Sequence, residues 1–99
     1  MYARMHILQT SPEEHDRGLE LVRDQILPWL RDSTGFRGLI RLENRTEGKT
    51  LVVTLWADEE ALRASAEAAE RLTALAVDTS GATREGVEEF DVTFFDLRV

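Results

Sequence analysis

The 99 residues are 42% hydrophobic and 31% charged, which are the proportions of a folded domain rather than of a disordered segment. The formal net charge of −7 argues against nucleic acid as a partner, because phosphate binding needs a clustered basic face, and no apolar run approaches the ~20 residues of a membrane span. Without cysteine, the chain offers no disulfide, thiol nucleophile or thiolate metal ligand. The N-terminal residues also lack the apolar centre of a secretory signal, so we expect a cytoplasmic protein with one domain, residues 1–99.

The first predicted element is a strand over Tyr2–Gln9. Its alternation places Ala3, Met5 and Ile7 on one side and Tyr2, Arg4, His6 and Leu8 on the other. Because both sides carry apolar residues, we expect both faces of the sheet to be covered.

A helix follows, which we expect to begin at Pro12. Ser11 is suited to the N-cap, and Glu14 completes a capping box. Apolar residues then recur at spacings of three and four along one stripe, namely Leu19, Val22, Ile26, Trp29 and Leu30. Pro28 within this stretch removes one backbone hydrogen bond, so we expect a kink or an irregular last turn. Gly35 is the expected stop.

A hairpin and a second helix occupy the middle of the chain. The strands are predicted at about Phe36–Asn44 and Thr50–Trp56, and Gly48 in the turn between them can adopt positive φ. Asp58 is a suitable N-cap for the second helix, which carries many small residues and gives way to a loop over Asp78–Thr83.

A long final strand is predicted over Gly86–Val99, and its apolar residues change sides. Phe90, Val92 and Phe94 share one face, whereas Phe95, Leu97 and Val99 share the other. Such a switch indicates a bulge, or a strand that leaves one environment for another. The end of the strand therefore either crosses toward a second subunit or lies as an apolar C-terminus beneath a surface loop.

The order strand, helix, strand, strand, helix, strand predicts an α+β, ferredoxin-like fold with a four-stranded antiparallel sheet. The two helices would cover one face of this sheet and leave the other face bare in a monomer. Because an apolar sheet face must be covered by something, we expect a homodimer.

Few residues indicate chemistry by themselves. No glycine-rich phosphate loop is present, and two isolated histidines do not make a metal site. His15, in the first turn of the first helix, is expected to be exposed. His6 is either a partly buried histidine bonded to the backbone or a proton-transfer group that titrates near neutrality. Trp56, at the end of the third strand, is either core or the wall of a ligand cavity.

The middle of the chain resembles the antibiotic biosynthesis monooxygenase family of small dimeric α/β barrels. The resemblance rests on Gly35-Phe36-x-Gly38, on Leu51–Trp56, and on Glu59-Glu60-Ala61-Leu62 with Ser65. It implies a cofactor-independent monooxygenase acting on an aromatic or polyphenolic metabolite, in which the substrate itself reduces dioxygen and no metal or flavin is required. The alternative is a non-catalytic ligand-binding or accessory protein on the same fold.

The resemblance also implies roles for individual residues. His6 would help to deprotonate a phenol, in a cavity shared with Trp56, which would orient the aromatic ring. Arg4 or Arg41 would stabilise the phenolate. The apolar wall would include Trp29, Phe36 and Phe90. A slip of one residue in strand register would instead place His6 in the dimer interface. Because Ala66–Gly81 contains no histidine, unlike the haem-degrading branch of the family, we expect no haem binding.

Overall fold

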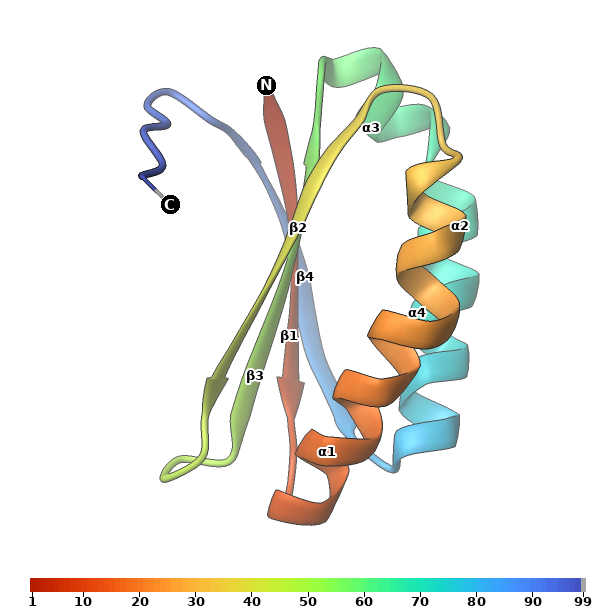
Figure 1. Ribbon diagram of the computed structural model, residues 1–99, viewed down its shortest axis with the longest axis vertical. Helices are drawn as coiled ribbons and strands as arrows, with labels where there is room; N and C mark the ends of the chain where they lie inside the picture. The colour runs from red at the N-terminus through yellow and green to blue at the C-terminus, as the bar shows by residue number, and fades with distance from the viewer. Residues whose placement is uncertain (99) are drawn as a thin grey trace.

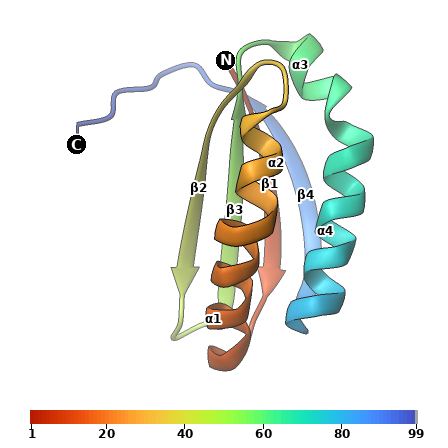
Figure 2. The same cartoon turned by 45° about the vertical axis from the view of Figure 1, so that its right-hand side comes forward.

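A computed structural model describes residues 1–98, with the side chains of all of these except positions 76 and 78–80. Its elements follow the predicted order (Figure 1), namely β1 Tyr2–Gln9, α1 Pro12–Leu21, the π-helical turn η1 Val22–Ile26, α2 Leu27–Arg31, β2 Phe36–Asn44, β3 Lys49–Trp56, α3 Glu59–Ala64, α4 Ala66–Ser80 and β4 Thr83–Asp91. The strands pair antiparallel in the order β2-β3-β1-β4, and the helices cover one face of the sheet (Figures 1 and 2). The predicted α+β, ferredoxin-like fold is confirmed. No helix in the described part of the chain is long and apolar enough to cross a membrane.

The first helix begins and bends where the sequence indicates. The Ser11 side chain accepts a hydrogen bond from the Glu14 backbone N–H, and the Glu14 carboxylate accepts one from the Ser11 backbone N–H, which confirms the capping box. The expected irregularity is the π-turn η1, which lies directly before Pro28 rather than in the last turn. Proline has no N–H for the carbonyl of Asp24, and its ring crowds that carbonyl, so a wider turn before it relieves both problems.

The second predicted helix differs from the structure in two ways. It divides at Ser65 into α3 and α4, and α4 then continues to Ser80 through much of the stretch predicted as a loop. Gly81 ends the helix in the left-handed conformation, with φ of +83°, as is common directly after a helix C-terminus. The loop over Asp78–Thr83 is therefore wrong except at Gly81 and Ala82, because the glycine and not the polar run before it stops the helix.

The final strand is also shorter and earlier than predicted. Within residues 1–98, β4 pairs only with β1, and its last partner is Tyr2, opposite Asp91. One further backbone hydrogen bond joins the Val92 N–H to the Met1 carbonyl at 2.9 Å. Beyond that point no neighbouring strand is left to pair with, so residues 93–98 leave the sheet on the side away from the helices (Figure 1). The predicted strand Gly86–Val99 is therefore correct as far as Asp91 and wrong over residues 92–98, and Val99 lies outside the described residues.

Strand register decides which side chains face the helices. His6 of β1, Val52 of β3 and Arg41 of β2 form one row across the sheet on the helix side. His6 therefore does not lie on the open face, as a register slip would have required. The open face carries apolar side chains that are 40–50% exposed, namely Ile40 at 40%, Leu42 at 50% and Phe90 at 46%.

Candidate functional site

A cavity of about 70 Å³ lies between the sheet and the helices. Its walls come from the helix-facing sides of β1, β2 and β3 and from α1, η1, α2 and α4, which lie side by side over the sheet (Figure 2). Most of the lining is apolar, with a few polar groups at separate points, which is the usual composition of a ligand site. We call it the sheet–helix cavity.

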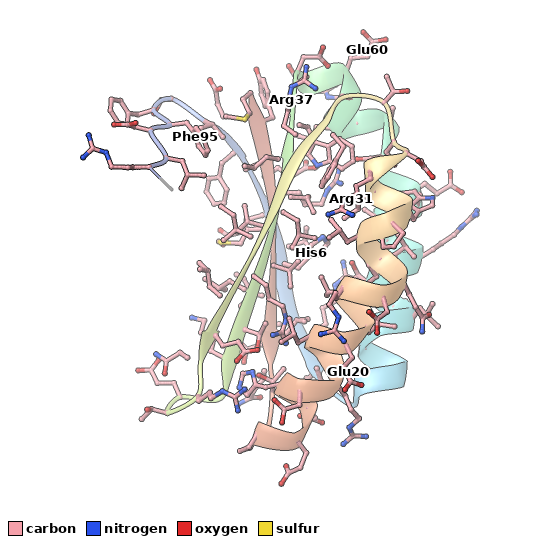
Figure 3. The ribbon with its side chains drawn as sticks, in the orientation of Figure 1. His6, Glu20, Arg31, Arg37, Glu60 and Phe95 are labelled. Carbon is pink, nitrogen blue, oxygen red and sulfur yellow. The ribbon has the colours of Figure 1, made fainter. Side chains whose placement is uncertain are left out.

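His6 lies on the sheet side of this cavity and points toward the helices (Figure 3). The residue is only 7% exposed, and its Nδ1 is 3.3 Å from the Thr73 hydroxyl of α4. Burial lowers the pKa of the imidazole to about 4, with further lowering by the positive charges of Arg4 and Arg84 and partial opposition from Glu70. The ring is therefore neutral at pH 7.

Trp56 lines the same cavity, and neighbouring side chains hold its ring in place. It is 1% exposed, its indole N–H donates to the Thr54 hydroxyl at 3.0 Å, and Phe36 packs edge-on against it at 5.6 Å between ring centroids. Trp56 is four residues along β3 from Val52, the partner of His6, which is ~13 Å at about 3.3 Å per residue. Only an extended ligand could therefore touch both side chains at once.

Arg4 faces the helices but is absent from the cavity wall. Its guanidinium donates to the Leu62 carbonyl at 2.7 Å, to the Ser65 hydroxyl at 3.0 Å and to the Glu89 carboxylate at 3.1 and 3.2 Å. The side chain thus ties β1 to the junction between α3 and α4. Because Arg4 does not contact the cavity, the structure gives no support for its predicted role in substrate binding.

Arg41 does line the cavity, and its position depends on a glycine. The guanidinium donates to the His15 carbonyl at 3.1 Å and forms an ion pair with Glu43. A Cβ atom at position 18 of α1 would lie 2.9 Å from its Nη2, so Gly18 leaves the space that the guanidinium occupies. Its charge is balanced by Glu43, which also pairs with Arg45.

The three predicted wall residues have different places. Trp29 lines the cavity. Phe36 is not on the cavity wall, but its ring packs edge-on against the ring of Trp56. Phe90 lies opposite Ala3, and because side chains alternate along a strand, it belongs to the open face of the sheet. The prediction of Phe90 as a cavity wall therefore does not fit the register.

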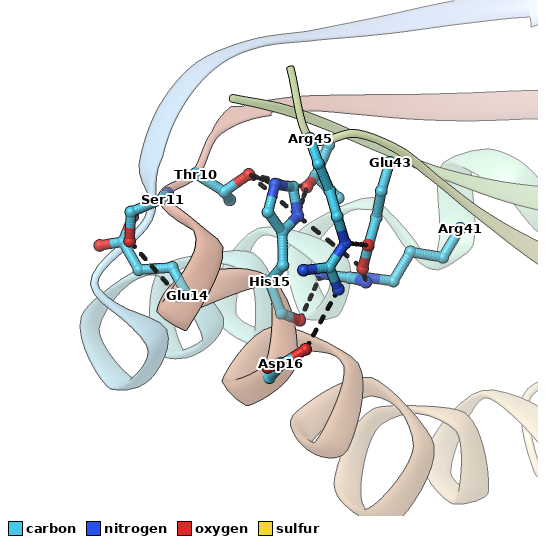
Figure 4. A network of polar contacts seen from close by, with 9 residues as sticks. Thr10, Ser11, Glu14, His15, Asp16, Arg41, Glu43 and Arg45 are labelled. Carbon is cyan, nitrogen blue, oxygen red and sulfur yellow. Dashed lines mark hydrogen bonds and ion pairs between the residues drawn. The ribbon is translucent and has the colours of Figure 1, made fainter. Parts of the chain in front are cut away.

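His15 is a buried polar residue next to the site that the sequence did not reveal. It is 0% exposed, and its ring nitrogens lie 3.0 Å from the Thr50 hydroxyl and 3.1 Å from the Thr10 hydroxyl (Figure 4). The expectation of exposure is wrong, because the first turn of α1 lies against Thr10, directly after β1, and Thr50, near the start of β3. The signal was its spacing of seven and eleven residues from Val22 and Ile26, which continues the apolar stripe backward.

Among the described residues, no cluster of three or more histidine, aspartate or glutamate side chains is arranged to hold a metal ion. The buried polar groups of the site instead bond to one another, and no buried side-chain nitrogen or oxygen in the described part lacks a partner.

Solved structures share this fold. The chain superposes on a candidate antibiotic biosynthesis monooxygenase of Deinococcus radiodurans with a TM-score of 0.73 and 15% identity, covering 100% of this chain and 99% of that one. SnoaB, a cofactor-independent oxygenase from Streptomyces nogalater, superposes with a TM-score of 0.71 and 13% identity, covering 95% of this chain and 94% of that one. MhuD, solved with two manganese protoporphyrin IX molecules per active site, superposes with a TM-score of 0.67 and 21% identity, covering 99% of this chain and 100% of that one. At these identities the likeness is one of fold, and the chain has the fold of the antibiotic biosynthesis monooxygenases.

Two sequence relatives come from Mycobacterium tuberculosis. The uncharacterized protein Rv2557 is 30% identical over 92 residues, which is 93% of this chain and 41% of that protein. The uncharacterized protein Rv2558 is 34% identical over 67 residues, which is 68% of this chain and 28% of that protein. The chain thus spans less than half the length of these relatives. No protein-family model matches the chain.

Proposed function

We propose that the protein is a cofactor-independent monooxygenase that oxidises an electron-rich aromatic molecule in the sheet–helix cavity. The observation that carries the proposal is a buried, neutral histidine, His6, on the wall of a mainly apolar cavity that Trp29 and Trp56 also line. The fold shared with SnoaB, described as a cofactor-independent oxygenase, supports the same reaction class.

In this reaction the ring carbon of an anthrone-type substrate first passes one of its two hydrogens to the carbonyl oxygen, which gives the phenolic tautomer, and the phenolic hydroxyl then gives that proton to His6. The resulting anion supplies electrons to dioxygen, and a carbon–oxygen bond forms at the ring carbon to give a peroxide, which takes the proton back from His6. The remaining carbon–hydrogen bond and the oxygen–oxygen bond then break, so that one oxygen atom stays on the carbon as a carbonyl and the other leaves as water with the two hydrogens that the carbon originally carried. Trp29 and Trp56 would hold the ring system, and the dioxygen is the only oxidant required.

The pKa of His6 limits how much this residue contributes. A phenol with a pKa of about 10 lies roughly six units above an imidazolium with a pKa of about 4, so a full proton transfer is uphill by about 8 kcal/mol. Attraction between the new imidazolium and the phenolate offsets part of that cost. Arg41, in the same row of side chains and ~10 Å away across two strands, also attracts the phenolate and lowers the cost further. We therefore expect His6 to contribute about 10²-fold, the lower end of the range for general base catalysis.

The size of the cavity supports a second candidate function. Sites for drug-sized ligands occupy roughly 300–1,000 Å³, several times the volume of this cavity. A substrate with two or three rings would have to push α1 and η1 away from α4, and the π-turn is the irregular point of that wall. If the wall does not yield, the protein is a non-catalytic ligand-binding or accessory protein on the same fold.

The proposed assembly is a homodimer that covers the open face of the sheet, which would complete a dimeric α/β barrel. The apolar side chains of Ile40, Leu42 and Phe90 are exposed there, and Phe95 of the C-terminal segment lies on the same side (Figure 3). A second copy and a small aromatic molecule are the proposed partners. The absence of cysteine supports the cytoplasm as the proposed location.

Oxygen consumption tests the proposal. Wild type and His6→Ala are compared on a panel of hydroquinone- and anthrone-type substrates, with Val87→Ala as control. Val87 is the β4 neighbour of His6 but is not on the cavity wall. We expect turnover by wild type and by Val87→Ala, and about 100-fold slower turnover by His6→Ala. Equal rates would remove His6 from the mechanism, and no turnover on the whole panel would favour the accessory function.

A further inference from the structure

The hydroxyl of Thr73 makes two contacts that only one arrangement of hydrogens satisfies. Its Oγ1 lies 2.8 Å from the Ala69 carbonyl, one turn earlier in α4, and 3.3 Å from Nδ1 of His6. A hydroxyl has a single proton, and a carbonyl can only accept, whereas an imidazole nitrogen can donate. The shorter contact therefore takes the hydroxyl proton, an arrangement common for threonine in helices, and Oγ1 is left to accept from the Nδ1–H of His6.

This arrangement settles the state of the second ring nitrogen. A neutral imidazole carries one N–H, so a proton on Nδ1 leaves Nε2 with a free lone pair. In the described part of the chain Nε2 has no hydrogen-bond partner, whereas every fully buried side-chain nitrogen there has one. Nε2 is therefore not fully buried, and because His6 lines the sheet–helix cavity, we take this atom to be open to the cavity.

We infer that Thr73 is a positioning residue that holds His6 in the Nδ1–H tautomer, so that Nε2 is the atom that accepts a proton from a molecule in the cavity. The catalytic consequence rests on the proposed function, but the tautomer itself does not. The other partner of the hydroxyl, the Ala69 carbonyl, belongs to the backbone of α4, so the helix fixes the direction in which Oγ1 accepts.

The charged groups around His6 do not set this choice. Arg4 on β1 and Arg84 on β4 disfavour a positive ring, while Glu70 on α4 favours it and is itself paired with Arg84. These charges act on whether the ring is protonated twice. The choice between two neutral tautomers is left to the direct contact with Thr73, since it is the one hydrogen bond that either ring nitrogen makes with the described residues.

The test is the ¹H–¹⁵N NMR spectrum of the histidine rings at pH 7, in wild type, Thr73→Val and Thr73→Ser. His6→Gln identifies the His6 signals, and the unchanged His15 signals report that the fold is intact. We expect wild type to show the Nδ1–H form, Thr73→Val to show a mixture, and Thr73→Ser to return to the wild-type pattern. An Nε2–H ring in wild type, or an unchanged ring in Thr73→Val, would overturn the inference. The wild-type spectrum alone decides the tautomer if the valine variant fails to fold.

Kinetics separate this inference from the proposed function. For a substrate that the enzyme turns over, Thr73→Val should lower kcat about two- to fivefold and leave KM nearly unchanged, because kcat falls by the factor by which the competent tautomer is depleted. Thr73→Ser should restore the wild-type kcat. A change in KM alone, or an equal loss in the serine variant, would refute the positioning role. If no substrate turns over, the proposed function fails while the ring spectrum still tests the tautomer.

Discussion

Acidification should destabilise this protein through His6, by an amount that the structure sets. The pKa of His6 is about 4 in the folded protein and 6.5 in the unfolded chain. Between these values the unfolded chain binds a proton that the folded protein does not, so the free energy of unfolding falls as the pH falls. The stability is fully present above pH 6.5 and is lost progressively toward pH 4.

The magnitude follows from the size of the shift. A difference of about 2.5 units corresponds to a total loss of about 3 kcal/mol, of which about 2 kcal/mol is already lost between pH 7 and pH 5. In a domain of this size, that loss lowers the midpoint of thermal unfolding by roughly 8–16 °C. Carboxylates also titrate in acid, so the His6 contribution must be measured as a difference between variants.

The assay is urea denaturation at pH 7 and pH 5, at one protein concentration, for wild type, His6→Gln and Val87→Ala. Glutamine keeps a polar group beside Thr73 but does not titrate. We expect wild type and Val87→Ala to lose about 2 kcal/mol more than His6→Gln over this interval. If all three variants show the same pH dependence, the buried, neutral His6 on which the proposed site depends is refuted.

Three further outcomes follow from the fold and the sequence. Leu42→Glu, on the open sheet face, should convert a dimer to a monomer in light scattering, whereas Leu75→Glu on α4, equally exposed at 49%, should not; a wild type that is already a monomer, or a Leu42 variant that stays a dimer, would contradict the proposed interface. Haemin titration should give no sharp one-to-one Soret change, because Ala66–Gly81 offers no histidine ligand, and a stoichiometric change would show this to be wrong. Gly35→Ala should cost about 2–4 kcal/mol in urea denaturation, because φ is +80° and a Cβ would meet a side chain at 2.5 Å, while Gly86→Ala, with open space around it, should cost less than about 1 kcal/mol; equal losses would contradict the stated strain.

Local signals made the first half of the fold predictable. Ser11 with Glu14, Gly48 in the hairpin turn and Asp58 before α3 act on neighbouring residues, so their effects can be read from a short stretch of sequence. The ends of α4 and β4 could not be read in this way. The length of β4 depends on where β1 begins, which is a pairing between residues about 90 positions apart.

The candidate site was predictable only in part, for the same reason. The even side of β1 brought His6 to the cavity, and alternation along one strand was sufficient to group it with Leu8. The fate of Arg4 depended on Glu89 and Ser65, which come from elements far along the chain. Likewise the partners that bury His15 lie at the ends of two strands, and one of them, Thr50, is 35 residues away.

The most direct test of the proposed reaction is a single-turnover experiment under ¹⁸O₂ with an anthrone-type substrate, in which product mass and rate are followed together. We expect one ¹⁸O atom in the quinone product of wild type, the second in water, and the same labelled product formed about 100-fold more slowly by His6→Ala. An unlabelled product, or wild-type speed in the His6 variant, would contradict the claim that this cavity carries out the oxygenation.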